Sequence, residues 1–262
     1  MTRPILTLTT DFGLTDHFAG TMKGVILSIC PAAQIVDISH GVTPFEIGEG
    51  AYLIAQAWRY FPKKTVHVVV VDPGVGTARR PILVEAGGQY FLGPDNGVLS
   101  MLYLHEKSKV RHVANEKYFR HPVSQTFHGR DIFAPVGAHL AAGVPAARMG
   151  KLMKDYLKPE FEKPHRAGKR TWIGRILKID RFGNIVTNIH VNDFGDLATR
   201  NFTLALGPQE VTALARNYAE GGAGELFLIL GSSGYYEVSL REGSAAKLVK
   251  CETGAAVELM VW

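Results

Sequence analysis

Residues 65–71 read TVHVVVV, an almost unbroken apolar run that ends directly before Asp72. A short run rich in β-branched residues, without alternation between polar and apolar positions, is typical of a strand buried on both faces of a sheet. Similar β-rich runs occupy residues 4–10, 34–38 and 82–86. Helical patterns lie between several of these runs, so the sequence predicts an α/β fold with a mostly parallel central sheet.

The first half of the chain also contains three predicted helices. Two of them span residues 17–29 and 131–142, and the third follows Thr43. Thr43 and Glu46 have the spacing of a capping box and Pro44 suits the first helical turn, so we expect this helix to begin at about Pro44. Its apolar residues recur every three or four positions on one face: Ile47, Ala51, Ile54 and Trp58.

The second half of the chain has a different character. Strand-like runs separated by Gly, Asn, Asp or Ser turns follow one another, among them residues 170–180, 182–191 and 245–250, without a long amphipathic helical pattern. We therefore predict two domains joined by a basic linker. The N-terminal α/β domain takes residues 1–150, the linker residues 151–170, and a smaller all-β domain residues 171–262.

The net charge of +5 is concentrated in one segment. Residues 148–175 hold nine Lys or Arg and three Asp or Glu, which leaves the remainder of the chain close to neutral. A basic stripe can bind nucleic acid, but this one has no interleaved aromatic platform and no recognised motif. We interpret it as a solvated linker, with an anion-binding patch as the alternative, and predict no nucleic-acid partner.

Other global features exclude several classes of protein. No apolar run approaches the ~18 to 20 residues of a membrane span, and the N-terminal residues lead straight into a strand-like run rather than a signal peptide. We therefore expect no membrane partner. The two cysteines, Cys30 and Cys251, are far apart and form no CxxC pattern, which fits a cytoplasmic location. The chain has no HExxH motif and no suitably spaced histidine pair, so we expect no metal site.

Two acidic residues follow predicted strands directly: Asp11 after ILTLTT, and Asp72 after the run quoted above. Ligands of open α/β sheets collect at the carboxyl ends of the strands, where loops converge over a crevice. A capped turn explains one such aspartate equally well, but two at equivalent positions favour a binding site.

The loop that follows Asp72 reads PGVGTARR. Gly74 and Gly76 allow a backbone path that other residues resist. The third glycine of a dinucleotide-binding loop is missing, and no acidic residue in a suitable context lies about 20 positions later, so we do not interpret the loop as a phosphate cradle. Its length allows Arg79 to fold back onto Asp72.

His128 lies in TFHGRDIFAP, residues 126–135, just before a predicted helix. A lone histidine is more often structural than catalytic, and the nine other histidines of the chain have no informative context. By itself, this stretch leaves the role of His128 open.

Seven motifs follow one another across nearly the whole chain: TTDFGLTD, HGVTPFEIGEGAYLI, VVVVDPGVGTARR, LGPDNGVLS, TFHGRDIFAP, IDRFGNIVTNI and LGSSGYYEVSLREGSAA. Together and in this order they resemble one family, the S-adenosylmethionine (SAM) hydroxide adenosyltransferases. These proteins are adenosine-forming hydrolases related to the adenosyl fluoride and chloride synthases. The resemblance implies an N-terminal α/β domain, a barrel-like C-terminal β domain, and a homotrimer that binds SAM at its subunit interfaces without a cofactor.

The resemblance also implies a reaction. An Asp–Arg–His set, here Asp72, Arg79 and His128, holds a water or hydroxide that attacks C5′ of the ribose and expels methionine. A sulfonium is already a good leaving group, so alignment of the water, ~7 to 11 kcal/mol, and a positioned base, ~10²- to 10⁴-fold, would supply the rate. Asp72 would accept the water's proton, while Arg79 and His128 orient the water.

The resemblance further assigns substrate contacts. The carboxylate of Asp11 can accept hydrogen bonds from both ribose hydroxyls, whereas Asn184 by itself also fits a Gly-Asn hairpin turn. A site rich in aspartate suits the positive charge of SAM. The implied adenosine contacts are Asp11, Asp72, Asn184, Ser232, Ser233 and Glu237, and the implied methionine contacts are Asp16, Asp180 and Phe45.

Two other functions are compatible with the motifs. The halide-using relatives replace the aspartate and histidine at the positions of Asp72 and His128, and a carboxylate at Asp72 would repel a bound halide, so we favour hydrolysis. The second alternative is a sensor that binds SAM or adenosine without turnover. Removal of the (R)-sulfonium epimer would explain a hydrolase that otherwise wastes SAM, and we favour that epimer as the substrate.

Overall fold

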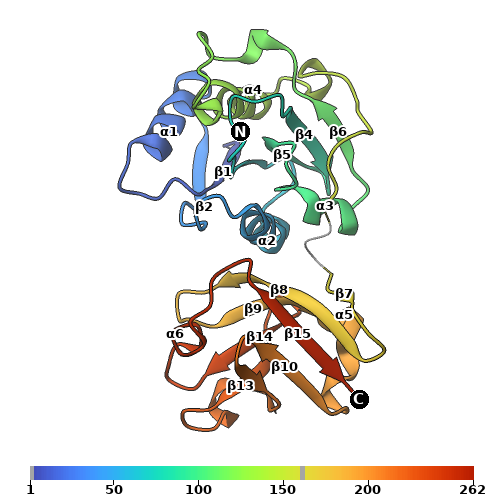
Figure 1. Ribbon diagram of the computed structural model, residues 1–262. Helices are drawn as coiled ribbons and strands as arrows, with labels where there is room; N and C mark the ends of the chain where they lie inside the picture. Colours follow the sequence, from blue (N-terminus) through green and yellow to red (C-terminus); the bar gives the residue numbers. More distant parts are fainter. Residues whose placement is uncertain (1–2, 160–162) are drawn as a thin grey trace. The chain divides into compact units, whose positions relative to one another are not determined.

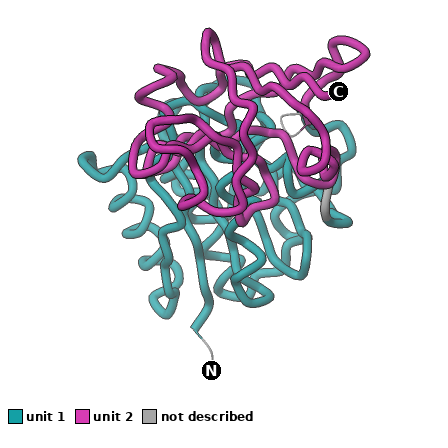
Figure 2. Tube along the Cα trace, turned by 90° about the horizontal axis from the view of Figure 1, so that it is seen from below, with its two compact units in different colours: residues 1–159 teal, residues 160–262 magenta. Residues whose placement is uncertain are grey.

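The computed structural model describes residues 3–159 and 163–262 (Figure 1). The chain divides into two compact units, residues 1–159 and 160–262, drawn in teal and magenta in Figure 2. The division lies inside the predicted linker, and the three linker residues 160–162 lie outside the described residues.

The first unit contains a six-stranded sheet in the order β2-β1-β3-β5-β4-β6. Strand β1 pairs in parallel with β2 and β3, and β3 pairs in parallel with β5, whereas β4 runs antiparallel to β5 and β6. The strands are β1 Ile5–Thr10, β2 Gln34–Ser39, β3 Val66–Val70, β4 Pro81–Ala86, β5 Gln89–Pro94 and β6 Lys109–His112.

Helices cover both faces of this sheet, which follows from the apolar run at its centre. Val68 and Val70 of β3 contribute to a core with α1 and α4, while Val69 and Val71 contribute to a second core with α2 and α3 (Figure 1). Every residue of β3 is therefore buried. The helices are α1 Phe18–Ile29, α2 Ile47–Ala57, α3 Ser100–His105 and α4 Ala134–Ala141, the last preceded by a π-helical turn at Gly129–Phe133.

The predicted start of α2 is wrong. The helix begins at Ile47 rather than Pro44, and neither Thr43 nor Glu46 caps it with a side chain. Phe45 instead has a left-handed backbone, with φ of 70°, and its N–H points to the carboxylate of Asp11 rather than into the helix. The sequence rule fails here because the tertiary hydrogen bond with Asp11 accompanies a left-handed turn at Phe45, which places residues 44 and 45 outside the helix.

The second unit is built on a nine-stranded sheet in the order β11-β10-β15-β8-β9-β14-β13-β12, with β7 beside β8. Its apolar core includes Ile185 and Ile189 of β9, Leu204 of β10 and Leu259 of β15. The strands are β7 His165–Arg166, β8 Thr171–Ile179, β9 Ile185–His190, β10 Phe202–Leu206, β11 Gln209–Val211, β12 Leu214–Ala215, β13 Leu226–Leu230, β14 Tyr235–Leu240 and β15 Ala256–Val261.

Two short helices, α5 Val191–Phe194 and α6 Ala245–Val249, make this unit mainly β rather than all-β. The interpretation of residues 245–250 as a strand is wrong. The Ser244 side chain accepts a hydrogen bond from the Lys247 backbone N–H, which caps α6, and Ala, Lys and Leu are good helix formers. Mixed α/β structure with two sheets is confirmed.

Part of the predicted linker is fixed to the first unit. The N–H of Leu157 donates to Asp95 at 2.9 Å, and Arg80 Nη1 donates to the carboxylate of Asp155 at 2.8 Å. The N–H of Met153 donates to the carbonyl of Val110 at 2.9 Å. Residues 151–157 are therefore not a free tether. None of the helices in residues 3–159 and 163–262 is long and apolar enough to cross a membrane.

Candidate active site

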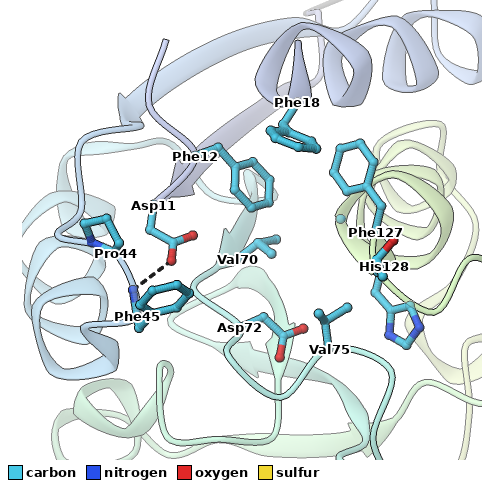
Figure 3. Close-up of a pocket in the computed structure, with 12 residues that line it drawn as sticks. Asp11, Phe12, Phe18, Pro44, Phe45, Val70, Asp72, Val75, Phe127 and His128 are labelled. Carbon is cyan, nitrogen blue, oxygen red and sulfur yellow. Dashed lines mark hydrogen bonds between the residues drawn. The ribbon is translucent and has the colours of Figure 1, made fainter. Parts of the chain in front are cut away.

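A pocket of about 250 Å³ opens in the first unit where the ends of β1 and β3 meet the loops that precede α2 and the π-helical turn (Figure 3). Asp11 and Asp72 follow the two strands, as the sequence predicts. His128 enters from the third loop. The remaining lining residues are mainly apolar: Phe12, Phe18, Pro44, Phe45, Val70, Val75, Thr126, Phe127 and Gly129.

Arg79 joins Asp72 to His128. Its Nε donates to Asp72 Oδ1 at 2.9 Å, and its Nη2 donates both to Asp72 Oδ2 and, at 2.7 Å, to His128 Nδ1. Because a guanidinium only donates, Nδ1 of the neutral imidazole is an acceptor and Nε2 carries its proton. The side chains of Arg79 and Asp72 are only 9% and 5% exposed, so this arrangement is held away from bulk water.

The glycine-containing loop makes that arrangement possible. The N–H of Val75 donates to the carbonyl of Asp72, and that of Thr77 to Gly74, two successive turns that bring Arg79 back. Gly76 has a φ of 79°, and a Cβ there would lie 2.2 Å from the carbonyl oxygen of Gln125. The loop therefore needs this glycine for close contact with the segment that carries His128, rather than for phosphate binding.

His128 stands in an environment that favours its neutral form. Burial lowers the pKa of the imidazole, and the positive charge of Arg79 lowers it further. The carboxylates of Asp72 and Asp131 and a hydrogen bond with the Ser124 backbone oppose this shift. The imidazole is thus neutral at physiological pH, which its role as an acceptor from Arg79 requires.

Asp131 holds the loop of His128 in place, a role that was missed in the sequence. Its side chain is fully buried, and it accepts hydrogen bonds from the Ser124 N–H at 2.9 Å and from both Arg130 Nε and Arg130 Nη2 at 2.7 Å. Arg120 Nη1 adds a contact at 3.2 Å. The adjacent Arg-Asp pair in HGRD was the available signal, but it does not reveal the partners.

Asp11 is held from the opposite side of the pocket. Its Oδ2 accepts a hydrogen bond from the N–H of Phe45 at 3.0 Å, shown as the dashed line in Figure 3. Burial raises the pKa of the Asp11 carboxyl and the nearby charge of Asp72 adds to this, while the Phe45 N–H opposes it. The pocket therefore concentrates negative charge at two carboxylates.

Three phenyl rings form an apolar wall beside these carboxylates. The ring centroids of Phe12, Phe18 and Phe127 are 5.1 to 5.8 Å apart, with edge-on or tilted contacts. Such a wall, together with two carboxylates, suits a ligand that carries both an apolar portion and a positive charge.

A second group of predicted residues lies in the other unit. Asn184 Nδ2 donates to Asp180 Oδ2 at 2.9 Å, and Asp180 Oδ1 accepts from the N–H groups of Asn184 and Phe182. The hairpin interpretation of Asn184 therefore describes its local structure, because these bonds close the turn between β8 and β9. Burial raises the pKa of Glu237, the charge of Asp180 adds to this, and a hydrogen bond with Tyr218 opposes it.

The other predicted residues differ in their surroundings. Ser232 is exposed, whereas Ser233 Oγ is buried without a hydrogen-bond partner among the described residues. Asp16 is exposed on the loop before α1 and does not line the pocket. Tyr218, which contacts Glu237, was not predicted from the sequence.

Family models match both units. The SAM hydroxide adenosyltransferase N-terminal domain matches residues 6–150, and the SAM hydroxide adenosyltransferase C-terminal domain matches residues 174–258. The chain belongs to the SAM hydroxide adenosyltransferase family.

Curated and solved relatives cover almost the whole chain. The (R)-S-adenosyl-L-methionine hydrolase of Methanocaldococcus jannaschii is 34% identical over 98% of this chain and 95% of its own length. A fluorinase of Nocardia brasiliensis is 29% identical over 99% of this chain and 97% of its own length. The solved structure of an uncharacterized conserved protein from Thermotoga maritima is similar with a TM-score of 0.86 at 36% identity, covering 98% of this chain and 99% of that one.

The first unit brings together five of the predicted site residues: Asp11, Phe45, Asp72, Arg79 and His128. Asp180, Asn184 and Glu237 form a separate group within the second unit. The sequence predicts these residues, but not their partners Asp131 and Tyr218 or the bonds that arrange them.

Proposed function

We propose that this protein hydrolyses (R)-SAM to adenosine and L-methionine. The observation that carries the proposal is the hydrogen-bonded set of Asp72, Arg79 and His128 beside a pocket that contains a second carboxylate and an aromatic wall. The curated relative from Methanocaldococcus jannaschii, which bears the name of this activity, supports it.

The reaction we propose is a displacement at C5′ of the ribose. The water oxygen forms a bond to C5′, the C5′–S bond breaks, and its electron pair leaves with the sulfur, which becomes the neutral thioether of methionine. Asp72 accepts the water's proton. Both of its oxygens already accept from Arg79, but each carboxylate oxygen has a further lone pair for the water.

Arg79 and His128 would orient the same water. Arg79 Nη1 is buried and has no hydrogen-bond partner among the described residues, so it is an available donor. Because Nδ1 of His128 accepts from Arg79, its one proton lies on Nε2, which takes part in the hydrogen bond with the Ser124 backbone. We therefore propose that His128 orients the water through its hold on Arg79. Donors directed at the developing hydroxide keep it in line with C5′ and stabilise its negative charge in the transition state. The sulfonium leaves without an acid at sulfur.

Asp11 is our proposed ribose ligand, since its carboxylate has lone pairs beyond the one that accepts from Phe45. We also propose that Asn184, Ser232, Ser233 and Glu237 contact adenosine, and that Asp16, Asp180 and Phe45 contact methionine. The reaction needs no cofactor in this proposal, and dialysis against a chelator is expected to leave the rate unchanged. A cytoplasmic location stays a prediction from cysteine usage.

The test is incubation of the protein with each epimer of SAM in ¹⁸O-labelled water, followed by mass spectrometry of the products. We expect adenosine labelled at its 5′ oxygen, unlabelled methionine, and faster cleavage of the (R) epimer. Faster cleavage of the (S) epimer would contradict the choice of substrate. Labelled homoserine together with 5′-methylthioadenosine would show attack on the methionine side of the sulfonium and exclude attack at C5′.

Three variants separate an enzyme from a sensor. Asp72→Ala and His128→Ala are expected to lose adenosine formation while they still bind ligand, and the exposed His165→Ala serves as the control. A protein that binds SAM but forms no adenosine in its parental form is a sensor. Parental rates in both site variants would show that the catalytic assignment is wrong.

A halide-dependent reaction is the second candidate because of the fluorinase relative. The carboxylate of Asp72 lines the pocket, and it would repel a halide at the position of the attacking water. In chloride or fluoride buffers we therefore expect adenosine as the main product. Preferential formation of 5′-halo-5′-deoxyadenosine would overturn this choice.

A further inference from the structure

A buried polar cluster adjoins Asp11 but does not line the pocket. Thr10, the last residue of β1, is fully buried, and its Oγ1 lies 2.7 Å from Nδ1 of His40, which is only 4% exposed. The same Oγ1 accepts the N–H of Phe12 at 3.3 Å. The cluster thus reaches the backbone on both sides of Asp11.

The donors and acceptors of the cluster can be assigned. His40 Nε2 lies 3.1 Å from Asp37 Oδ1, although it is poorly aligned for a full hydrogen bond, and Asp37 Oδ2 accepts from Lys23 Nζ at 2.5 Å. A carboxylate beside Nε2 favours the proton on that nitrogen. Nδ1 is then the acceptor, so the hydroxyl of Thr10 donates to His40 and is free to accept from Phe12.

His40 also holds the turn after Asp11 through its main chain. The carbonyl of His40 accepts the N–H of Gly13 at 2.7 Å, and the N–H of Val42 donates to the carbonyl of Thr10 at 3.3 Å. One residue therefore anchors Thr10 on one side of Asp11 and Gly13 on the other. The position of the Asp11 carboxylate depends on this short turn.

Aspartate, histidine and a hydroxyl also make up nucleophilic triads, but this cluster is not one. Thr10 has no exposed surface, and the His40 side chain is 2% exposed, so no substrate can reach the hydroxyl. The cluster can therefore affect the site only through the backbone on either side of Asp11.

We propose that His40 is a positioning residue for Asp11, acting through Thr10 and Gly13 to hold the carboxylate where it accepts hydrogen bonds from the ribose hydroxyls. This inference rests on the proposed function, because it deepens the role of Asp11 in substrate binding. It predicts that a change in the cluster affects affinity only for ligands that carry those hydroxyls.

The experiment compares two ligands and a set of matched variants. Thr10→Val removes the hydroxyl without changing the size of the side chain, Thr10→Ser keeps it, and His40→Leu removes the acceptor. Thr9→Val is the control, because Thr9 is equally buried on the same strand and its hydroxyl has no partner among the described residues. Dissociation constants are measured by calorimetry for adenosine and for 2′,3′-dideoxyadenosine.

The parental protein is expected to bind adenosine more tightly than the dideoxy analogue. Thr10→Val and His40→Leu are expected to weaken adenosine binding roughly five-fold, about the value of one lost hydrogen bond, and to leave the analogue unaffected. Thr10→Ser and Thr9→Val should match the parental protein for both ligands. In turnover, Thr10→Val should raise KM for SAM with little change in kcat.

Each other outcome has a definite meaning. Equal weakening of both ligands in Thr10→Val would show a general loss of structure and overturn the inference, as would parental affinity for adenosine. If the parental protein binds neither adenosine nor SAM, the proposed function fails first and the inference with it. Thermal unfolding of each variant identifies any that does not fold, and the Thr10→Ser and His40→Leu pair then decides the question.

Discussion

At the scale of single residues, Arg79 is the centre of the candidate site. It donates to Asp72 through two nitrogens and to His128 through one of them, so one planar group sets the position of both neighbours. A lysine carries the same charge but cannot make this forked contact. Charge alone therefore does not explain the choice of residue.

We expect Arg79→Lys to lower kcat by about 100-fold with a smaller change in KM, because a misplaced water costs the transition state more than the ground state. Steady-state kinetics with (R)-SAM measures both constants. Arg80→Lys is the matched control, since Arg80 pairs with Asp95 and Asp155 instead. Unchanged turnover in Arg79→Lys would show that the fork has no role in the reaction.

His128 leads to a prediction about pH. Burial and Arg79 lower the pKa of its imidazole from 6.5, and protonation would bring a second positive charge against Arg79. Activity should therefore be constant above that pKa and fall as the pH drops through it, with a midpoint below 6.5.

The midpoint can be assigned with His128→Asn, whose amide oxygen can replace Nδ1 as the acceptor but does not titrate. In this variant, the acidic fall in kcat/KM should move to lower pH, where carboxyl groups such as Asp11 titrate. An unmoved midpoint would assign the titration to another group.

At the scale of elements, the turn before α2 has a non-helical backbone that contacts the pocket. Phe45 adopts a φ of 70° and is 69% exposed as a residue, while its N–H donates to Asp11. A left-handed backbone costs a bulky residue about 1 kcal/mol or more. A strained, exposed aromatic residue at a pocket rim indicates a role in binding rather than in stability.

We expect Phe45→Gly to leave the stability of the protein unchanged or to raise it by up to about 1 kcal/mol, while KM for SAM increases. Lys64 is an exposed residue with a φ of 69° away from the pocket, so Lys64→Gly should have the same effect on stability and none on KM. Thermal unfolding and steady-state kinetics give the two readouts. A loss of stability in Phe45→Gly alone would mean that its ring supports the fold.

The centre of the first sheet contains a buried histidine that the site does not use. His67 on β3 contacts Thr7 of β1 through Nδ1 at 2.7 Å and Gln89 of β5 through Nε2 at 2.5 Å, and it stacks on Phe91. Burial lowers the pKa of His67 to about 4, and the hydrogen bond with Gln89 opposes this shift. The imidazole therefore joins three strands in its neutral form.

This histidine makes stability depend on pH. In the unfolded chain the pKa of this histidine is about 6.5. Between pH 6.5 and about 4 the imidazole is therefore protonated in the unfolded state but neutral in the folded state. Stability should fall by about 3 kcal/mol as the pH drops through this window and then level off with respect to this group. Denaturant unfolding at a series of pH values measures it.

The variant His67→Gln is expected to be less stable than the parental protein at pH 7.5 but to lose less stability on acidification. His165→Gln is the control, since His165 is exposed on β7 and lies outside this network. Parallel pH curves for His67→Gln and the parental protein would refute the assignment.

At the scale of the whole molecule, each unit contains a group of the predicted site residues. The resemblance to the family predicts a homotrimer with active sites at its subunit interfaces. Analytical ultracentrifugation is expected to give the mass of three chains at the concentrations used for kinetics. A monomer with full activity would refute the trimeric site.

The basic segment shows how far charge patterns can be interpreted. Its first residues, 151–157, pack onto the first unit through Arg80, Asp95 and Val110 rather than forming a free tether. A local excess of Lys and Arg is visible in the sequence, but the partners that fix a segment lie far along the chain. Composition therefore locates a charged segment, but it does not show whether the backbone of that segment packs against a domain.

The sequence by itself determined those features that depend on neighbours along the chain. The run that ends at Asp72 identified a strand buried on both faces, and the placement of Asp11 and Asp72 directly after strands located the pocket, because side-chain periodicity and strand ends are local properties. Likewise, the order of seven motifs identified the family.

Only the tertiary structure decided the arrangement of the site. The Arg79–His128 bond joins residues 49 positions apart, and the Thr10–His40 contact joins residues 30 positions apart. Phe45 lies outside the predicted first turn of α2, and its N–H donates to Asp11, 34 positions away. Such bonds depend on which loops the folded sheet brings together. Periodicity in the sequence concerns neighbouring positions and does not predict contacts between distant loops. The residues of the site can be found in the sequence, whereas their chemistry is set by the fold.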